Sequence, residues 1–98
     1  MIIKKTVNGS QLTLAPEGRL DTLTAPELEA AVAPCINETN DLVFDFSKLE
    51  YISSAGLRVL LSTQKKMAAK GKFTVKGVNE TVREIFEITG FSDILNIE

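Results

Sequence analysis

The sequence of 98 residues contains no histidine, no tryptophan and only one cysteine, Cys35. Without histidine, neither a Ser-His-Asp nor a Cys-His catalytic arrangement can form. The usual zinc ligand sets are excluded for the same reason. A single cysteine also precludes an internal disulfide, and the place of Cys35 among apolar residues at helical spacing favours a small buried side chain. The sequence therefore predicts no metal centre and no cofactor.

Nucleotide-binding motifs and long apolar runs are missing as well. Neither GxxxxGK[ST] nor GxGxxG occurs, and Gly71-Lys72 lacks the upstream glycine of a phosphate loop. No apolar stretch is long enough to span a membrane, and the first five residues do not have the design of a signal peptide. We therefore expect a cytoplasmic protein with no membrane span.

Charge and length indicate the kind of partner and the number of domains. The formal net charge is -2, and the lysines are scattered rather than clustered with aromatic residues, which disfavours nucleic acid as a partner. With 44% hydrophobic residues, the chain can bury one core of modest size. The sequence predicts a single domain over residues 1–98 whose partners are proteins.

The N-terminal third has the pattern of a hairpin followed by a helix. Residues 2–7 and 11–15 are predicted strands joined at Asn8-Gly9, Pro16 is expected to end their pairing, and residues 18–21 are expected to form a loop. Thr24 and Glu27 have capping-box spacing for a helix. Its apolar stripe is Leu28, Ala31, Val32, Cys35 and Ile36, and Pro34 is expected to kink or loosen it.

The centre of the chain combines a strand, a serine pair and a helix. Residues 42–46 form a nearly continuous apolar run, as in a strand covered on both faces. After Ser53-Ser54 the period changes to that of a helix. Its predicted buried face contains Leu57, Leu60, Leu61, Gln64, Met67 and Ala68, with Arg58, Ser62, Lys65 and Lys66 opposite. The serines lie at the helix N-terminus, where a hydroxyl caps well and a phosphate is tolerated.

The remaining residues predict one more strand and one more helix. Residues 72–76 alternate as a strand, and Asn79 is a suitable N-cap for a helix over 80–89 that ends at Gly90. Its expected inward positions are Val82, Ile85, Phe86 and Ile88, and residues 94–97 are a candidate short strand. The whole pattern predicts an α/β fold with a mixed sheet of four to five strands and about four helices.

Two motifs give the chain a resemblance to a known family. Gly18-Arg-Leu-Asp21 precedes the first predicted helix, and Asp45-Phe-Ser-Lys-Leu-Glu-Tyr-Ile-Ser-Ser-Ala-Gly-Leu57 surrounds the serine pair. In this order and spacing they resemble the STAS domain, which anti-sigma-factor antagonists share with the cytosolic tails of sulfate transporters. The resemblance covers essentially the whole chain. Because no apolar stretch could span a membrane, it points to the free-standing antagonists.

The resemblance implies a binding switch controlled by phosphorylation. In antagonists of this type, the unphosphorylated protein binds an anti-sigma factor that is also a serine kinase, phosphorylation ends the binding, and a PP2C-type phosphatase resets the switch. By alignment the acceptor is Ser54, two residues before Gly56, and Asp21 matches the family's loop aspartate. The partner-binding residues are then expected to be Asp21, Thr22, Ser53, Ser54, Ala55, Gly56 and Arg58.

One position departs from the family pattern. Many members have an aspartate immediately before the acceptor, where this chain has Ser53, so Ser53 is the second candidate acceptor. The sequence does not predict an enzyme, because a serine nucleophile would need a base and the sequence offers no histidine and no lysine close before Ser54. One alternative function remains. A scaffold or small-ligand sensor with the same fold would need no phosphorylation.

Overall fold

The computed structural model describes all 98 residues, which form six strands, three α-helices and one short 3-10 helix. The strands are β1 (Ile2–Asn8), β2 (Gln11–Leu20), β3 (Asp41–Asp45), β4 (Leu49–Ile52), β5 (Lys72–Lys76) and β6 (Asn96–Ile97). The helices are α1 (Ala25–Ile36), α2 (Ser54–Ala68), α3 (Glu80–Thr89) and the 3-10 helix η1 (Phe91–Asp93). The predicted mixed α/β class is confirmed, with more strands than the four to five expected.

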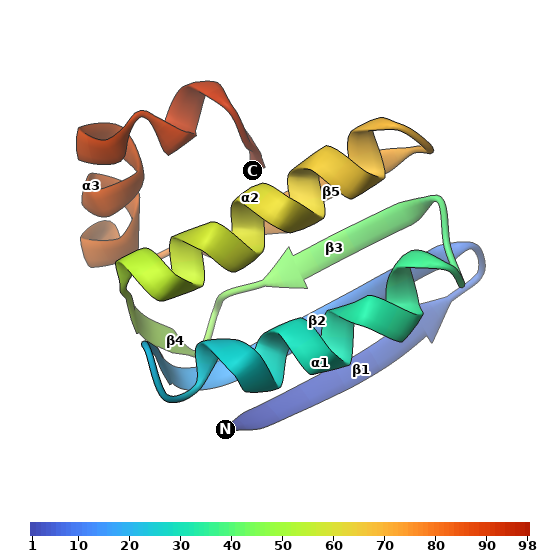
Figure 1. Cartoon of the computed structure of the whole chain (residues 1–98), viewed down its shortest axis with the longest axis horizontal. Coiled ribbons are helices and arrows are strands. Elements are labelled where there is room, and N and C mark those ends of the chain that lie inside the picture. Colours follow the sequence, from blue (N-terminus) through green and yellow to red (C-terminus); the bar gives the residue numbers. More distant parts are fainter.

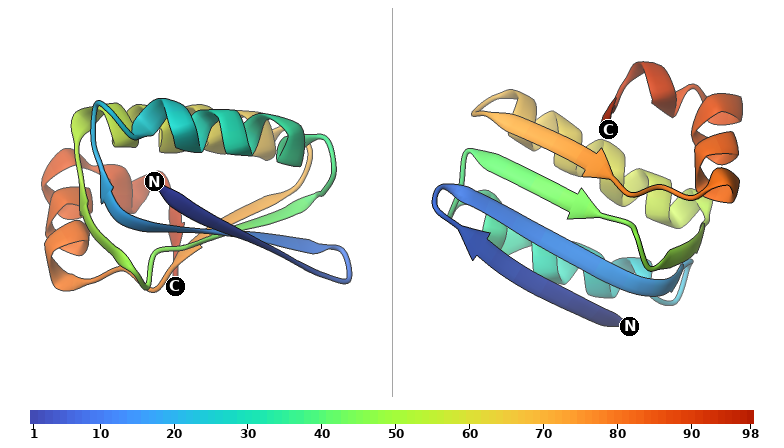
Figure 2. Two further views of the ribbon diagram at one scale, coloured as in Figure 1. Left: turned by 90° about the horizontal axis from the view of Figure 1, so that it is seen from below. Right: turned by 180° about the vertical axis from the view of Figure 1, so that it is seen from behind.

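The sheet has the order β1-β2-β3-β5-β6, and only β1 runs antiparallel to its neighbour. Helices α1 and α2 lie side by side on one face of the sheet and begin at the same end (Figure 1). The opposite face carries no helix, and α3 lies at the end of the sheet near β4 (Figure 2). The prediction that β3 and β5 are parallel neighbours connected through α2 is confirmed.

A single hydrophobic core fills the space between the sheet and the two long helices. Leu14 and Phe44 contribute from the strands, and Leu28 and Leu60 from the helices, all at 1% exposure or less. The ring of Phe44 contacts that of Phe73 edge-on, with centroids 4.8 Å apart. Because α1 and α2 are anchored along their length by this core, their N-terminal ends have fixed positions at one end of the sheet.

Strand β2 differs most from its sequence prediction. Pro16 was expected to end the pairing, but β2 continues to Leu20 and Pro16 lies opposite Ile3 of β1. On its other side β2 pairs with β3 through Leu14 and with β4 from Gly18 onward. Pro16 falls in the gap between these two partners, where a missing backbone N–H costs no ladder bond on that side.

The hairpin turn and the buried faces of α2 and α3 also correct the sequence predictions. The tight turn lies at Gly9-Ser10, with Asn8 opposite Gln11, one residue later than expected. Ile88 was predicted to face inward, but it is 84% exposed. On α2 the buried face includes Val59. The expected members Leu61 and Gln64 are only half-buried, and Ala68 is exposed.

The C-terminal elements otherwise follow the prediction. The side chain of Asn79 caps α3 by accepting a hydrogen bond from Val82 N at 2.8 Å. Gly90 ends the helix in the left-handed region, with φ of 82°, a conformation that favours glycine. The predicted terminal strand is present as β6, and it comprises only two residues.

Pro34 was expected to kink or loosen the first helix. Helix α1 nevertheless continues through Pro34 to Ile36.

Candidate functional site

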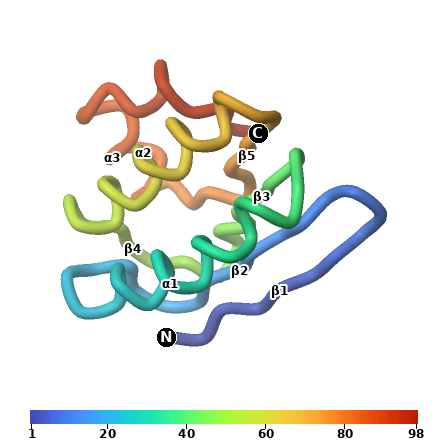
Figure 3. The backbone as a smooth tube through the Cα atoms, turned by 45° about the vertical axis from the view of Figure 1, so that its right-hand side comes forward, coloured from blue at the N-terminus to red at the C-terminus, as the bar shows by residue number.

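Two loops meet at the end of the sheet where α1 and α2 begin (Figure 3). The first leaves β2 at Leu20 and leads into α1, and the second leaves β4 at Ile52 and leads into α2. Leu20 and Ile52 are neighbours in the parallel β2–β4 pairing, and Ser53 N donates to Leu20 O at 2.8 Å. The sequence prediction that Asp21 and the serine pair lie at one sheet edge is therefore confirmed, and the short strand β4 is what brings them together.

The pairing of β2 with β4 contains a bulge and a bracing contact. Gly18 faces Leu49 while Arg19 faces Tyr51, so the register shifts by one residue. Gly18 has φ of 98°, which favours glycine and explains its place in the motif. The guanidinium of Arg19 lies 4.4 Å from the centroid of the Tyr51 ring, within the range of a cation–π contact.

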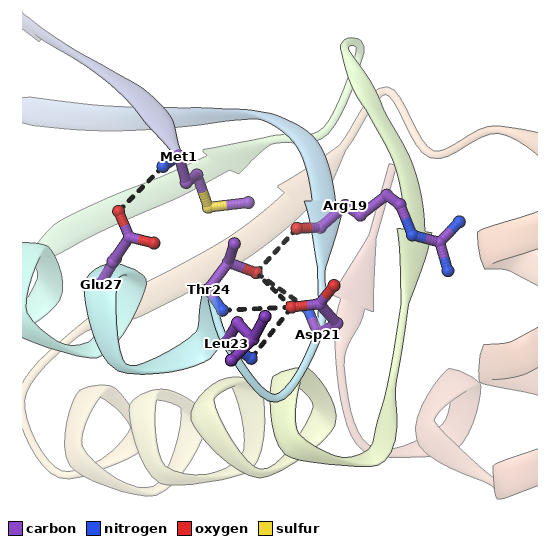
Figure 4. Close-up of polar contacts among 6 residues, drawn as sticks. All are labelled: Met1, Arg19, Asp21, Leu23, Thr24 and Glu27. Atoms are coloured by element: carbon purple, nitrogen blue, oxygen red, sulfur yellow. Dashed lines mark hydrogen bonds and ion pairs between the residues drawn. The ribbon is translucent and has the colours of Figure 1, made fainter.

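The Asp21 carboxylate shapes the first loop by accepting hydrogen bonds from the backbone amides of the next residues in that loop (Figure 4). Its Oδ1 accepts from Leu23 N at 3.0 Å and from Thr24 N at 3.1 Å. The bond from the Thr24 amide, together with that from Leu23, holds the pKa of the Asp21 carboxyl below its ordinary value, although partial burial acts in the opposite direction. Asp21 is therefore ionised at neutral pH and has a structural task in the loop.

Thr24 was predicted to cap α1 with its side chain, and the structure corrects this. Its hydroxyl makes no cap bond, and instead donates to Arg19 O at 2.7 Å and accepts from Asp21 N at 2.9 Å. These bonds close the loop between β2 and α1 (Figure 4). The capping-box spacing therefore identified Thr24 but predicted the wrong hydrogen bond for its hydroxyl. The same loop leaves Leu23 at 84% exposure beside the site.

The two serines have different environments. Ser54 is exposed and is the first residue of α2, as predicted. Ser53 is the N-cap residue with extended backbone, and its carbonyl accepts from Leu57 N at 2.9 Å. Its own Oγ is buried and has no hydrogen-bond partner in the protein. Of the two serines, only Ser54 is exposed at the surface of this turn.

The other predicted contact residues surround this turn at different depths. Thr22 and Arg58 are exposed, and Ala55 is half-buried. Gly56, predicted among the contact residues, is buried under the turn. An ideal Cβ on Gly56 would lie 2.7 Å from Ile52 Cγ1 and 2.8 Å from Leu20 Cγ, so only glycine lets α2 approach both loops this closely.

A groove of about 350 Å³ runs between the first halves of α1 and α2. We call it the α1–α2 groove, and its walls are Thr22, Ala25, Pro26, Glu29, Ala55, Arg58, Val59 and Ser62. Three of the predicted contact residues line the groove, namely Thr22, Ala55 and Arg58. No group of acidic, cysteine or histidine side chains could hold a metal ion, and no helix is long and apolar enough to cross a membrane. The arrangement provides a binding surface around an exposed hydroxyl.

The fold and this turn define a small α/β binding domain with a serine at the head of its central helix. The chain belongs to the STAS domain family, whose profile matches residues 2–98. The anti-sigma-B factor antagonist of Staphylococcus epidermidis is 33% identical over 82 residues, which cover 82% of this chain and 76% of that protein.

Solved structures agree with this assignment. An anti-sigma factor antagonist from Mycobacterium paratuberculosis superposes with a TM-score of 0.91 at 25% identity, covering 98% of this chain and 83% of that one. The phosphorylated form of SpoIIAA, a Bacillus cell fate determinant, has a TM-score of 0.75 at 17% identity over 99% of this chain and 91% of that one. At that identity the second comparison shows the shared fold.

Proposed function

We propose that this protein is a cytoplasmic anti-sigma factor antagonist whose binding is controlled by phosphorylation of Ser54. The observation that carries the proposal is the contrast between the exposed Ser54 and the buried Oγ of Ser53, at a turn fixed beside the Asp21 loop. The relative from Staphylococcus epidermidis, which is named as an antagonist, supports the class of partner. The partner is then an anti-sigma factor with serine-kinase activity, and a PP2C-type phosphatase removes the phosphate.

The geometry gives the switch a physical basis. A phosphate adds a charge of about -1.5 to -2 at neutral pH. On Ser54 it would lie at the N-terminus of α2, where the helix dipole favours an anion by about 0.3–1 kcal/mol, so the fold itself tolerates the modification. A partner surface fitted to the bare hydroxyl would instead face a bulky dianion next to the ionised Asp21. Binding is lost without any rearrangement of the domain.

The test begins with the anti-sigma factors encoded by the same genome, each purified and incubated with this protein and ATP. Intact mass is expected to show one added phosphate, and peptide fragmentation to place it on Ser54. The Ser54→Ala variant should bind the kinase persistently, whereas the phosphorylated protein and Ser54→Asp should bind weakly. Ser53→Ala is the matched control and should still be phosphorylated.

Three outcomes would contradict parts of this proposal. A phosphate on Ser53 would overturn the acceptor assignment. Equal affinity of the Ser54→Ala and phosphorylated forms would overturn the switch and favour a scaffold that works without phosphorylation. Absence of binding to every anti-sigma factor tested would overturn the class of partner and favour a small-ligand sensor.

A further inference from the structure

Helix α2 has a charge opposite to that of the rest of the chain. Its 15 residues include Arg58, Lys65 and Lys66 and no aspartate or glutamate. Outside α2 the chain has eight basic and thirteen acidic residues. The helix that carries the proposed acceptor is therefore a positive element on a negative protein.

The three cations are exposed and have no ion-pair partner. The ion pairs of the structure use Met1, Lys4 and Lys5, all of them in or next to β1. Arg58, Lys65 and Lys66 are available to a binding partner instead. Lys65 and Lys66 lie in the last turn of α2, where the helix dipole favours cations, whereas Arg58 lies in the N-terminal half, where the dipole gives it no such advantage.

The cations form a row that starts at the proposed phosphorylation site. Residues three, four and seven apart lie on the same side of a helix, so Ser54, Arg58, Leu61 and Lys65 follow one another along α2. We call this row the α2 basic stripe, with Lys66 at its flank. From Arg58 to Lys66 it extends about 12 Å, or two helical turns.

A hollow next to the stripe is continuous with the α1–α2 groove. This second hollow, of about 370 Å³, is lined by Arg58, Leu61, Ser62, Lys65 and Lys66, and it shares Arg58 and Ser62 with the groove. Across the groove, the α1 wall carries Glu29, so one wall is acidic and the other basic. A segment bound here would turn its acidic side toward α2.

We propose that the α2 basic stripe and the α1–α2 groove bind an acidic amphipathic helix of the anti-sigma factor. Grooves between two helices accept an amphipathic helix, whose apolar side here would meet Ala55 and Val59. Its carboxylates would pair with the three cations. This inference rests on the proposed function for the identity of the partner, while the charge and shape of the surface stand independently of it.

The inference also gives the switch a second component. A phosphate on Ser54 would stand at the head of the stripe, one helical turn from Arg58. Phosphate and guanidinium form strong paired hydrogen bonds, so the phosphate would occupy Arg58 and remove one cation from the partner. The remaining negative charge would repel the carboxylates of the bound helix. An acidic partner therefore makes phosphorylation more disruptive than a steric clash alone.

The main experiment measures the affinity of the anti-sigma factor for two variants with equal net charge. One variant neutralises the stripe with Arg58→Gln, Lys65→Gln and Lys66→Gln. The control variant carries Lys48→Gln, Lys72→Gln and Arg83→Gln, which change exposed cations on other elements. We expect the stripe variant to bind about tenfold or more weakly, and the control within about twofold of the unmodified protein.

Salt provides an independent readout of the same surface. Raising ionic strength from about 0.1 to about 1 M shortens the screening length from roughly 10 to 3 Å. The unmodified protein and the control variant should lose affinity over this range, and the stripe variant should lose much less. Circular dichroism should show the same fold for all three proteins. Equal affinities of the two variants would overturn the inference and leave the proposed function intact.

A peptide probe separates this inference from the identity of the partner. The probe is a 16-residue amphipathic peptide with leucines on one face and glutamates on the other, and its counterpart has lysines in place of the glutamates. We expect the acidic peptide to shift the amide resonances of α2 and the facing turns of α1, and the basic peptide to shift neither. If no anti-sigma factor binds, the proposed function fails, and the inference stands or falls with this result. Equal shifts from both peptides would overturn it.

Discussion

Replacing Gly56 by alanine tests how closely α2 must approach the two loops of the site. Gly56 is buried in the first turn of α2, and its closest neighbours are the side chains of Leu20 and Ile52, at 0% and 1% exposure. These are the last residues of β2 and β4, immediately before Asp21 and Ser53. A methyl group at Gly56 would therefore push on both loops from below.

The expected loss of stability is the difference between two opposing effects. Alanine is about 1 kcal/mol better than glycine inside a helix, which would stabilise the variant. The added methyl would lie 2.7 Å from Ile52 Cγ1 and 2.8 Å from Leu20 Cγ, distances that real side chains do not adopt, so these neighbours must shift. Overpacking of this kind costs about 1–3 kcal/mol. Because both neighbours are fully buried, we expect the upper part of that range, and a net loss of about 1–2 kcal/mol.

Urea denaturation followed by circular dichroism measures this loss directly. Lys65→Ala and Lys65→Gly, at an exposed position inside α2, give the helix propensity difference in this helix and so calibrate the favourable effect. Leu20→Ala should cost about 2–5 kcal/mol in the unmodified protein. It should cost clearly less in the Gly56→Ala background, because the methyl group partly fills the space that Leu20 leaves.

The close approach also predicts an effect on function. Gly56→Ala should weaken binding of the anti-sigma factor even at temperatures where the variant is fully folded, because it displaces the Asp21 and Ser53 loops. A Gly56→Ala protein that is as stable as the unmodified one would show that α2 has room to move away from the sheet. Additive costs of Gly56→Ala and Leu20→Ala would lead to the same conclusion.

Three further predictions concern the core, a cap and the site loop. Leu60→Ala should cost about 2–5 kcal/mol in urea melts because Leu60 is fully buried, whereas Leu61→Ala, at a half-buried position, should cost clearly less; equal losses would contradict the observed face of α2. Asn79→Ala should cost about 1 kcal/mol and speed hydrogen exchange at the Val82 amide, because it removes the cap of α3; unchanged exchange would contradict the cap. Because the pKa of Asp21 is lowered, the stability that its carboxylate contributes is present at neutral pH and is lost as the pH falls through that lowered value. The Thr24 amide resonance should therefore titrate with a midpoint below the ordinary pKa of an aspartate, and it should stay constant in Asp21→Asn.

The sequence predicted most elements because they carry strong local signals. The serine pair at the start of α2, the Asn79 cap and the Gly90 stop were each indicated by residues within one helical turn. The parallel pairing of β3 with β5 followed from the handedness of crossover connections. Where a local signal and the tertiary structure agree, sequence alone was sufficient.

Strand β4 could not be predicted in the same way. It has four residues, only the short turn at Ser47-Lys48 separates it from β3, and its pairing partner is the part of β2 after Pro16, which the proline made look like a loop. Strand β4 and the end of β2 from Gly18 to Leu20 pair with each other, and neither has a strong strand signal of its own. The prediction therefore placed Asp21 and Ser54 at one edge correctly, but without the pairing that holds them there.

The spacing of apolar residues also failed to predict which side chains are exposed at several positions. Ile88 follows the apolar spacing of α3, yet it lies on the side away from the core, because α3 contacts the end of the sheet and η1 rather than a whole sheet face. The burial of Ser53 Oγ and the exposure of Ser54 depend on the path of the chain from β4 into α2. Because both residues are serine, the sequence could not show which of them would be exposed. Such differences arise from packing angles rather than from residue type.

The pairing between β2 and β4 has a consequence for how the protein responds to temperature. It joins three residue pairs, against five between β3 and β5 and seven between β1 and β2. Short ladders open at a lower free energy than the rest of a domain, so we expect the amides of β4 to exchange with solvent faster than those of β3. Opening of β4 would separate the Asp21 loop from the serine turn while the main sheet stays intact. Warming would then shorten the lifetime of the partner-bound complex well before it melts the protein.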